Sequence, residues 1–232
     1  MTINRVCVIG GAGFIGSHMV RKLLNEGCGV RVFDNFRTGR VEFTEDWMGE
    51  DVEVYTKDIL TDHDSLMRAI DGCDWVIHLA ANPDARGERR GVDFNIQQNI
   101  IGTANVLDAM HHVGTSRILY ASSASVYGMT TENPVAEDCK FPVQSSFYGA
   151  SKLAGEGLIG AYCDEHQFTG INARWVHILG ERYLHGHIID FIRRLHRDPG
   201  RLHILGDGQQ AKSGLYAANL ADGLWTTMQH HD

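Results

Sequence analysis

A serine, a tyrosine and a lysine in this chain of 232 residues have the types and spacing that suit proton transfer to and from an alcohol. Ser123 follows an apolar run, and Tyr148 and Lys152 open a segment with a helical pattern. Because Tyr148 and Lys152 are four residues apart, they share one face of that helix. Tyrosine has a pKa of about 10 and is a poor base at neutral pH, but a lysine cation beside it lowers that value. We therefore expect a tyrosinate at Tyr148 that removes the proton of a hydroxyl held by Ser123.

A glycine-rich turn near the start of the sequence supplies the second half of such a reaction. The stretch GGAGFIG, residues 10–16, follows an apolar run at 6–9 and precedes an amphipathic segment. Gly10 permits a tight turn, Gly13 lets the backbone approach a pyrophosphate, and Gly16 lets the helix pack closely on a sheet. The amides and positive dipole end of that helix then face the phosphates. The pattern predicts a dinucleotide cofactor whose nicotinamide takes a hydride while Tyr148 takes the proton. The positive charge of the oxidised nicotinamide is expected to lower the pKa of Tyr148 together with the lysine cation.

The choice between NAD and NADP depends on the end of the second apolar run. Asp34 lies about 20 residues beyond the glycines, where a carboxylate accepts hydrogen bonds from the adenosine ribose. Because a carboxylate repels a 2′-phosphate, the sequence favours NAD. Arg37 and Arg40 follow closely and are able to hold such a phosphate, so NADP stays open as the alternative.

Apolar runs alternate with helical patterns along the first 180 residues. The strands are expected at 6–9, 30–33, 52–56, 75–79, 118–121 and 171–175, and the helices at 14–26, 62–70, 93–112 and 147–166. This alternation predicts an α/β fold with a Rossmann-like, doubly wound parallel sheet. Ligands of such sheets bind beyond the carboxyl ends of the strands.

The pattern changes after residue 180. A helix is expected at about 187–196, followed by a Pro-Gly turn, a short strand and a Gly-rich loop. The sequence therefore predicts an NAD-binding domain over 1–180, which carries the catalytic serine, tyrosine and lysine. It predicts a small, incomplete substrate-binding portion over 181–232.

Composition narrows the classes of partner and compartment. The net charge of −8 argues against a nucleic-acid surface. The five cysteines form no CxxC pair, and the histidine clusters at 111–112, 185–187 and 230–231 have no metal-ligand spacing, so no metal is predicted. No apolar run is long enough to span a bilayer and no signal-type segment precedes the first strand, so we predict no membrane association and a cytoplasmic protein.

Motifs along nearly the whole chain resemble the extended short-chain dehydrogenases/reductases, in the branch of nucleotide-sugar epimerases and dehydratases. The matching stretches are GGAGFIGSH, DNFRTGR, KDI, HLAA, NIIGTANVLDA, SSASVYG, YGASKLAGE and ILGDGQQAKSGLY. The resemblance implies Ser123, Tyr148 and Lys152 as catalytic residues, and NAD as the cofactor. The cofactor-binding residues that it implies, together with the strand ends next to them, are Gly10, Gly13, Phe14, Ile15, Asp34, Asn35, Asp58, Ile59, Leu79, Ala80, Ala81, Asn99, Ser122, Tyr148 and Lys152. The corresponding substrate-binding residues are Ser123, Ser125, His177 and Lys212.

Within this family, the residues directly after Ser123 favour one reaction. Dehydratases carry an Asp-Glu pair there for acid–base elimination of water, whereas this chain has Ala124 and Ser125. Decarboxylases usually place a glutamate at the position of Ser125. The stretch SSASVYG resembles the 4-epimerases, in particular UDP-glucose 4-epimerase. The predicted function is therefore NAD-dependent 4-epimerisation of a nucleotide sugar, with a UDP-sugar as the expected substrate, through oxidation at C4 and return of the hydride.

Three departures from the family concern the substrate side. His177 replaces a usual asparagine, Lys212 stands where many relatives have a phosphate-binding arginine, and Asn219 replaces a common aspartate. Relatives also typically continue for some 70–100 more residues. The alternatives are a net NAD-dependent dehydrogenase or reductase acting on a small alcohol, and a catalytically reduced NAD(H)-binding regulatory protein. The family's usual dimer interface corresponds to the helices at 93–112 and 147–166, so a homodimer is expected.

Overall fold

The computed structural model describes residues 2–47, 49–83, 91–132, 134–139, 143–184, 186–204 and 206–231. Its centre is a six-stranded parallel sheet with the strand order β3-β2-β1-β4-β5-β6. The strands are β1 Arg5–Ile9, β2 Gly29–Asp34, β3 Val52–Thr56, β4 Trp75–His78, β5 Arg117–Ala121 and β6 Thr169–Ala173. The order reverses between β1 and β4, so the crevice beyond their carboxyl ends is the expected ligand site of a doubly wound sheet. The predicted fold is confirmed.

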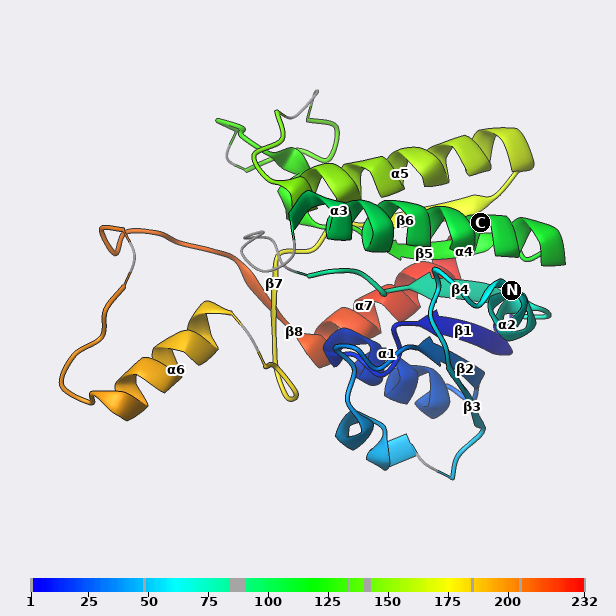
Figure 1. Ribbon diagram of the computed structural model, residues 1–232, viewed down its shortest axis with the longest axis horizontal. Coiled ribbons are helices and arrows are strands. Elements are labelled where there is room, and N and C mark those ends of the chain that lie inside the picture. The colour runs from blue at the N-terminus through cyan, green and yellow to red at the C-terminus, as the bar shows by residue number, and fades with distance from the viewer. Residues whose placement is uncertain are drawn as a thin grey trace.

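Helices cover both faces of the sheet (Figure 1). On one face lie α1 Phe14–Asn25 and α7 Ala217–His230, and on the other lie α2 His63–Ile70, α4 Gly102–Val113 and α5 Phe147–His166. Alternate residues of each strand point to opposite faces, because the side-chain period of a strand is two. Val6 and Val8 of β1 therefore join the core with α1 and α7, whereas Cys7 and Ile9 join the core with α2, α4 and α5.

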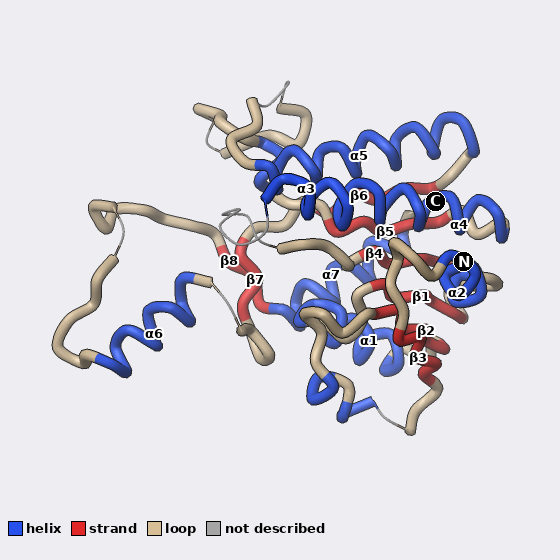
Figure 2. The backbone as a smooth tube through the Cα atoms, in the orientation of Figure 1, coloured by secondary structure: helices blue, strands red, loops and turns tan. Residues whose placement is uncertain are grey.

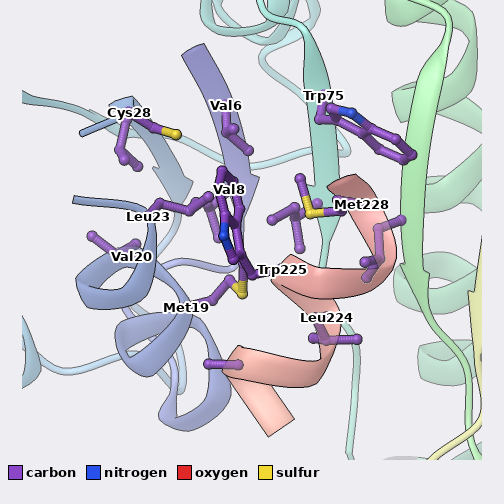
Figure 3. Close-up of a cluster of buried hydrophobic side chains, with 14 of the residues drawn as sticks. Val6, Val8, Met19, Val20, Leu23, Cys28, Trp75, Leu224, Trp225 and Met228 are labelled. Atoms are coloured by element: carbon purple, nitrogen blue, oxygen red, sulfur yellow. The ribbon is translucent and has the colours of Figure 1, made fainter. Parts of the chain in front are cut away.

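Helix α7 completes the first of these cores. Figure 3 shows Trp225 and Met228 of α7 beside Met19 of α1 and Val8 of β1. An ion pair of 2.8 Å between Lys22 and Asp222 joins the same two helices at the surface. The division of the chain at residue 180 stays a prediction, but α7, which follows that position, packs within the core of the sheet.

The predicted helix at 93–112 is present as three consecutive helical pieces. These are α3 Gly91–Asn95, a π-helical segment Ile96–Ile101, and α4. The π-helical turn carries the buried Asn99, whose side chain bonds to residues outside this helix. Single π turns inside α-helices occur frequently at functional sites. Their widened backbone has no signature in the hydrophobic period, so the sequence pattern did not reveal this one.

Helix α6, in the segment between β6 and α7, lies apart from the sheet (Figure 2). Strands β7 His177–Leu179 and β8 Gly214–Tyr216 pair in parallel, and α6 His187–Arg197 lies between them in the sequence. The strand predicted directly after the Pro-Gly turn is wrong, because residues 201–204 form no strand. Leu202 and Ile204 are 38% and 43% exposed there, without a strand edge beside them to complete a ladder.

The other elements differ little from expectation. Short 3₁₀ helices at Val41–Phe43, Glu45–Trp47 and Ala124–Tyr127 follow β2 and β5. Strand β6 begins and ends two residues earlier than predicted, at Thr169–Ala173. None of the described helices combines the length and apolar character that a membrane span requires.

Candidate active site

The glycine-rich turn joins β1 to α1 at the point where the strand order reverses. Gly10 has a φ of +85°, and a Cβ there would lie 2.7 Å from the backbone nitrogen of Ala80. A Cβ at Gly16 would collide with the carbonyl oxygen of Gly10, so close packing of α1 requires a glycine at this position. Helix α1 begins at Phe14 with Gly13 as its N-cap and has no acidic residue in its first turn. The first amides of α1 thus form the kind of cradle that holds a pyrophosphate.

Asp34 fastens this turn to the end of β2. Its Oδ2 accepts a hydrogen bond of 2.9 Å from the amide of Ala12, and its Oδ1 accepts one of 2.8 Å from the amide of Phe36. Burial raises the pKa of Asp34, while the two amides oppose that shift. Each carboxylate oxygen has further acceptor capacity, so Asp34 is able to bind a ribose hydroxyl as well.

The residues expected around the adenosine lie next to Asp34. Asn35 donates a hydrogen bond of 2.8 Å to Asp58, which in turn accepts from the amide of Leu60. Arg37 stacks on the ring of Phe94, with its guanidinium carbon 4.5 Å from the ring centroid. This contact holds Arg37 against α3.

The segment after β4, which is expected to pass beside the dinucleotide, runs next to the glycine turn. The amides of Leu79 and Ala80 both donate to the carbonyl of Ile9, at 2.8 and 3.0 Å. Asn99 is buried, and its side chain bonds to Ser151 of α5 and to the amide of Asn82. These side-chain bonds are internal to the protein, and the cofactor role of Asn99 stays a prediction.

Ser123 and Tyr148 come together at the carboxyl end of β5. Ser123 caps the 3₁₀ helix Ala124–Tyr127, and its Oγ accepts hydrogen bonds from the amide and the hydroxyl of Ser125, at 3.2 and 2.9 Å. The hydroxyl of Ser146 caps α5, which places Tyr148 in the first turn of that helix. A hydrogen bond joins the side chains of Ser123 and Tyr148.

Lys152 lies one turn further along α5 and is fully buried. Its Nζ donates a hydrogen bond of 2.7 Å to the carbonyl of Ala121, and lies 5.9 Å from the ring centroid of Tyr148. It also lies 4.7 Å from the ring centroid of Tyr120. The three predicted catalytic side chains are therefore close together.

The expected lowering of the Tyr148 pKa combines the charge of Lys152 with that of an oxidised nicotinamide, and without the cofactor the pKa of Tyr148 is raised. Burial lowers the pKa of Lys152 itself to about 7. Burial also raises the pKa of Tyr148, and only the hydrogen bond from Ser123 opposes that change. Because desolvation disfavours both charged forms, the lysine is no permanent cation beside the tyrosine. A charge brought by the cofactor is then needed to favour the tyrosinate.

Two functional candidates were missed by sequence reasoning. Glu156 lies one turn beyond Lys152, and Arg174 follows β6. The guanidinium of Arg174 binds both carboxylate oxygens of Glu156, at 2.9 and 2.7 Å. Ser122 donates its hydroxyl to Glu156, and its expected cofactor role stays a prediction. The continued four-residue spacing of 148, 152 and 156 is the signal that would have indicated Glu156.

Two of the predicted substrate residues, His177 and Lys212, lie on the segment that follows β6. The carbonyl of Trp175 accepts from the amide of Ala124 at 3.0 Å, which joins this segment to the Ser123 loop. The ring centroid of His177 lies 4.7 Å from that of His187. Burial is the largest cause that lowers the pKa of His177, and the charges of Lys212 and His187 lower it further. Lys212 is exposed.

No metal centre is apparent in the described part of the chain. No group of three or more histidine, cysteine, aspartate or glutamate residues is placed to hold an ion there. His185 of the predicted histidine clusters lies outside the described residues.

The whole of this arrangement belongs to a known family. A model of the NAD-dependent epimerase/dehydratase family matches residues 6–232, so the chain is a member of that family. The prediction of NAD as cofactor is confirmed at the level of the family.

Curated relatives in the family include two kinds of enzyme. The chain is 30% identical to UDP-glucuronic acid decarboxylase 1 of Danio rerio, over 97% of this chain and 54% of that protein. It is 32% identical to a putative UDP-glucose 4-epimerase of Methanocaldococcus jannaschii, over 93% of this chain and 70% of the relative. The chain thus spans about half the length of the relatives named UDP-glucuronic acid decarboxylase 1.

Solved structures in the comparison are mostly 4-epimerases. UDP-glucuronic acid 4-epimerase of Bacillus cereus, in complex with UDP-glucuronic acid and NAD, superposes with a TM-score of 0.86 at 28% identity, over 98% of this chain and 74% of that one. A UDP-galactose 4-epimerase superposes with a TM-score of 0.85 at 34% identity, over 98% and 74% of the two chains. The family assigned from the sequence motifs is confirmed.

Proposed function

We propose that the protein catalyses NAD-dependent 4-epimerisation of a nucleotide sugar, with a UDP-sugar as the substrate class. The observation that carries this proposal is the cluster of Ser123, Tyr148 and Lys152 at the carboxyl end of β5. It lies on the sheet edge that also bears the glycine-rich turn. The solved 4-epimerase structures support the same reaction.

Residues near the point where the strand order reverses, between β1 and β4, would hold the cofactor. The first amides of α1, next to Gly13, Phe14 and Ile15, would hold the pyrophosphate. Asp34 would accept from the adenosine ribose. The remaining residues proposed for cofactor binding are Gly10, Asn35, Asp58, Ile59, Leu79, Ala80, Ala81, Asn99, Ser122, Tyr148 and Lys152.

The bound nicotinamide supplies a reversible hydride acceptor. In the oxidation half of the reaction, Ser123 holds the C4 hydroxyl of the sugar and Tyr148 removes its proton. Lys152 orders the ribose and adds charge when it is protonated. The keto-sugar then turns in the site, and Tyr148 returns the proton as hydride reaches the opposite face of C4. No cofactor is consumed, because oxidation and reduction occur at the same carbon.

The residues after Ser123 support epimerisation over dehydration. Elimination of water requires a proton donor and acceptor beyond the tyrosine. Ala124 has no such group, and the hydroxyl of Ser125 donates to Ser123. For substrate binding we propose Ser123, Ser125, His177 and Lys212.

Decarboxylation is the second candidate, because the decarboxylase relatives favour it. Oxidation of UDP-glucuronic acid at C4 gives a β-keto acid, which loses carbon dioxide readily. Ser125 stands where decarboxylases usually have glutamate, and this residue favours the epimerase. Both reactions share the first oxidation and differ in the fate of the ketone.

One product analysis separates these functions. The protein is incubated with NAD and, separately, UDP-glucose, UDP-galactose and UDP-glucuronic acid, and the products are identified by NMR. We expect the C4 epimer, and no product from the Tyr148→Phe variant. Carbon dioxide and a UDP-pentose from UDP-glucuronic acid would establish the decarboxylase. Net NADH with a small alcohol would establish a dehydrogenase, and tight NAD binding without any turnover would establish a binding protein.

We further propose a homodimer formed through the helical layer of α3, α4 and α5. Val92, Ile96 and Ile101 are exposed apolar residues along one helical stretch, and Phe147 is exposed at the start of α5. Burial of these side chains would provide an apolar interface. Sedimentation of the wild type against an Ile96→Glu and Ile101→Glu double variant tests this, since the variant should be monomeric. A monomeric wild type at micromolar concentration would contradict the proposal.

A further inference from the structure

Three consecutive residues at the end of β5 each contact one residue of α5. The α5 residues follow one another at four-residue spacing, so they lie on one helix face. The contacts join Ser123 with Tyr148, Ala121 with Lys152, and Ser122 with Glu156. The first two contacts involve proposed catalytic residues. The third involves Glu156, whose side chain is buried and to which the reaction assigns no role.

Arg174 anchors this third contact to other elements. Its fork binds both carboxylate oxygens of Glu156, and its remaining nitrogen donates to the carbonyl of Glu137 at 2.8 Å and to the hydroxyl of Tyr127 at 3.3 Å. One guanidinium thus joins β6, α5, the 3₁₀ helix after Ser123 and the loop around Glu137. The bidentate geometry makes this a directional pair as well as a charged one.

The pair lies one turn of α5 beyond Lys152. The neighbouring titratable groups on β4 and β5 are neutral, because burial lowers the pKa of His78 to about 3 and raises that of Tyr120. Tyr148 on α5 is neutral for the same reason. Glu156, on the same face of α5 as Lys152, is paired with Arg174, so the two charges balance each other.

We infer that Glu156 and Arg174 are positioning residues whose ion pair holds the end of β5 in register with α5 and cancels charge beside the catalytic lysine. This inference rests on the proposed function, since it assigns Ser123, Tyr148 and Lys152 to the reaction. It predicts that the two members of the pair act on Lys152 in opposite directions. A purely structural pair would affect stability alone.

The test follows the titration of Lys152 by NMR of protein labelled with ¹³C at lysine Cε, without cofactor or substrate. The Lys152 signal is identified by its loss in Lys152→Met. Glu156→Gln leaves the Arg174 cation unbalanced and should lower the titration midpoint by about 0.5–1 pH unit. Arg174→Gln leaves the carboxylate unbalanced and should raise the midpoint by a similar amount. The double variant should return it to within about 0.3 unit of the wild type.

The controls separate charge from folding. Asp222→Asn breaks the Lys22–Asp222 pair on α1 and α7, away from this site, and should leave the midpoint unchanged. Arg174→Lys keeps the charge but loses the fork, so it should retain the wild-type midpoint. If Arg174→Gln does not fold, the wild type, Glu156→Gln and the double variant still decide the outcome. Equal shifts in one direction, or none, would overturn the inference.

A kinetic measurement completes the test. The kinetic assay uses a nucleotide sugar that the wild type converts. Relative to the wild type, Glu156→Gln should reduce kcat at least tenfold, while the Kd for NAD should change less than twofold. An unchanged kcat would overturn the positioning role. If the wild type turns over no nucleotide sugar, the proposed function fails, whereas the NMR titration still tests the charge balance at Lys152.

Discussion

The β5–α5 edge and the segment from β7 to β8 are built in different ways. At the β5–α5 edge, buried polar groups such as Ser122, Lys152 and Glu156 each bond to another part of the protein. Helix α6 in the other segment has no buried residue, and Ile192 and Leu195 on it are 58% and 39% exposed. Both regions carry apolar and polar residues in regular patterns. At the β5–α5 edge the described chain supplies partners for these residues, and at α6 it leaves them exposed.

The proposed catalytic residues and two of the proposed substrate-binding residues belong to these two different regions. The proposed catalytic side chains lie on elements that are fixed by packing on the sheet, so their geometry does not depend on the β7–β8 segment. His177 and Lys212 lie on a short strand and an exposed loop. We therefore expect the hydride-transfer machinery to be robust and the recognition of the sugar nucleotide to be the more easily changed property.

The largest expected effect is at Tyr148. Tyr148→Phe removes the hydroxyl that exchanges a proton with the C4 oxygen but keeps the buried ring. We expect kcat to fall about 10²–10⁴-fold, the range of general acid–base catalysis, while NAD binding is retained. Single-turnover kinetics and calorimetric titration with NAD measure the two quantities.

Tyr162→Phe is the matched control. Tyr162 lies on the same helix, and its ring packs against Phe168 with centroids 5.4 Å apart. It should keep at least half of the wild-type kcat. Equal losses in the two variants would mean that the effect of Tyr148→Phe came from α5 as a whole.

The second prediction compares the two regions by stability. Leu23 is fully buried between α1 and the sheet, so Leu23→Ala should lower the free energy of unfolding by about 2–5 kcal/mol. Ile192→Ala on α6 should change it by less than about 0.5 kcal/mol, because the side chain is mostly exposed. Urea unfolding followed by circular dichroism measures both. A large loss for Ile192→Ala would show that α6 has a packing partner in solution.

Local patterns explain what the sequence predicted correctly. Each core strand is a short apolar run bounded by turn residues. The glycines at 10, 13 and 16 indicate a tight turn and close packing, where a side chain would not fit. Tyr148 and Lys152 were predictable as a pair because both lie on one helix. Ser123 was predictable because it ends a strand on the ligand side of the sheet.

Other features depend on contacts that no local pattern encodes. The Glu156–Arg174 pair joins residues on two elements, so neither residue identifies its partner. The lowered pKa of Lys152 results from burial by the whole fold, which a local pattern does not encode. The strand expected after the Pro-Gly turn failed because an apolar run forms a strand only beside another strand edge.

The third prediction concerns the stability cost of the buried lysine. The pKa of Lys152 is about 7 in the folded protein, below the value of about 10.4 in an unfolded chain. Between these values the unfolded state binds more protons, so the stability contributed by this group rises with pH. The penalty is fully present below about pH 7 and disappears above about pH 10. Lys152→Met should therefore be more stable than the wild type at pH 6, by about 1–3 kcal/mol, since the lost bond to Ala121 offsets part of the gain.

Chemical unfolding of both proteins at several pH values checks this. The stability difference should narrow as the pH rises from 7 toward 10. A constant difference across that range would contradict a lowered pKa of Lys152. It would also contradict the conclusion that the buried lysine destabilises the folded protein.

The smallest expected effect contrasts the two ends of the sheet. Asp34 and Asp74 each accept two backbone amide hydrogen bonds, but Asp34 lies at the carboxyl end of β2 and Asp74 binds the amides of Asn4 and Arg5 at the amino end of β1. Asp34→Asn removes the charge proposed to face the adenosine ribose, so NAD affinity should fall about tenfold and the preference over NADP should narrow. Asp74→Asn makes the same chemical change and should leave both affinities within twofold of the wild type. Equal losses in the two variants would mean that Asp34 acts by supporting the backbone, and that the charge contributes nothing to the choice of cofactor.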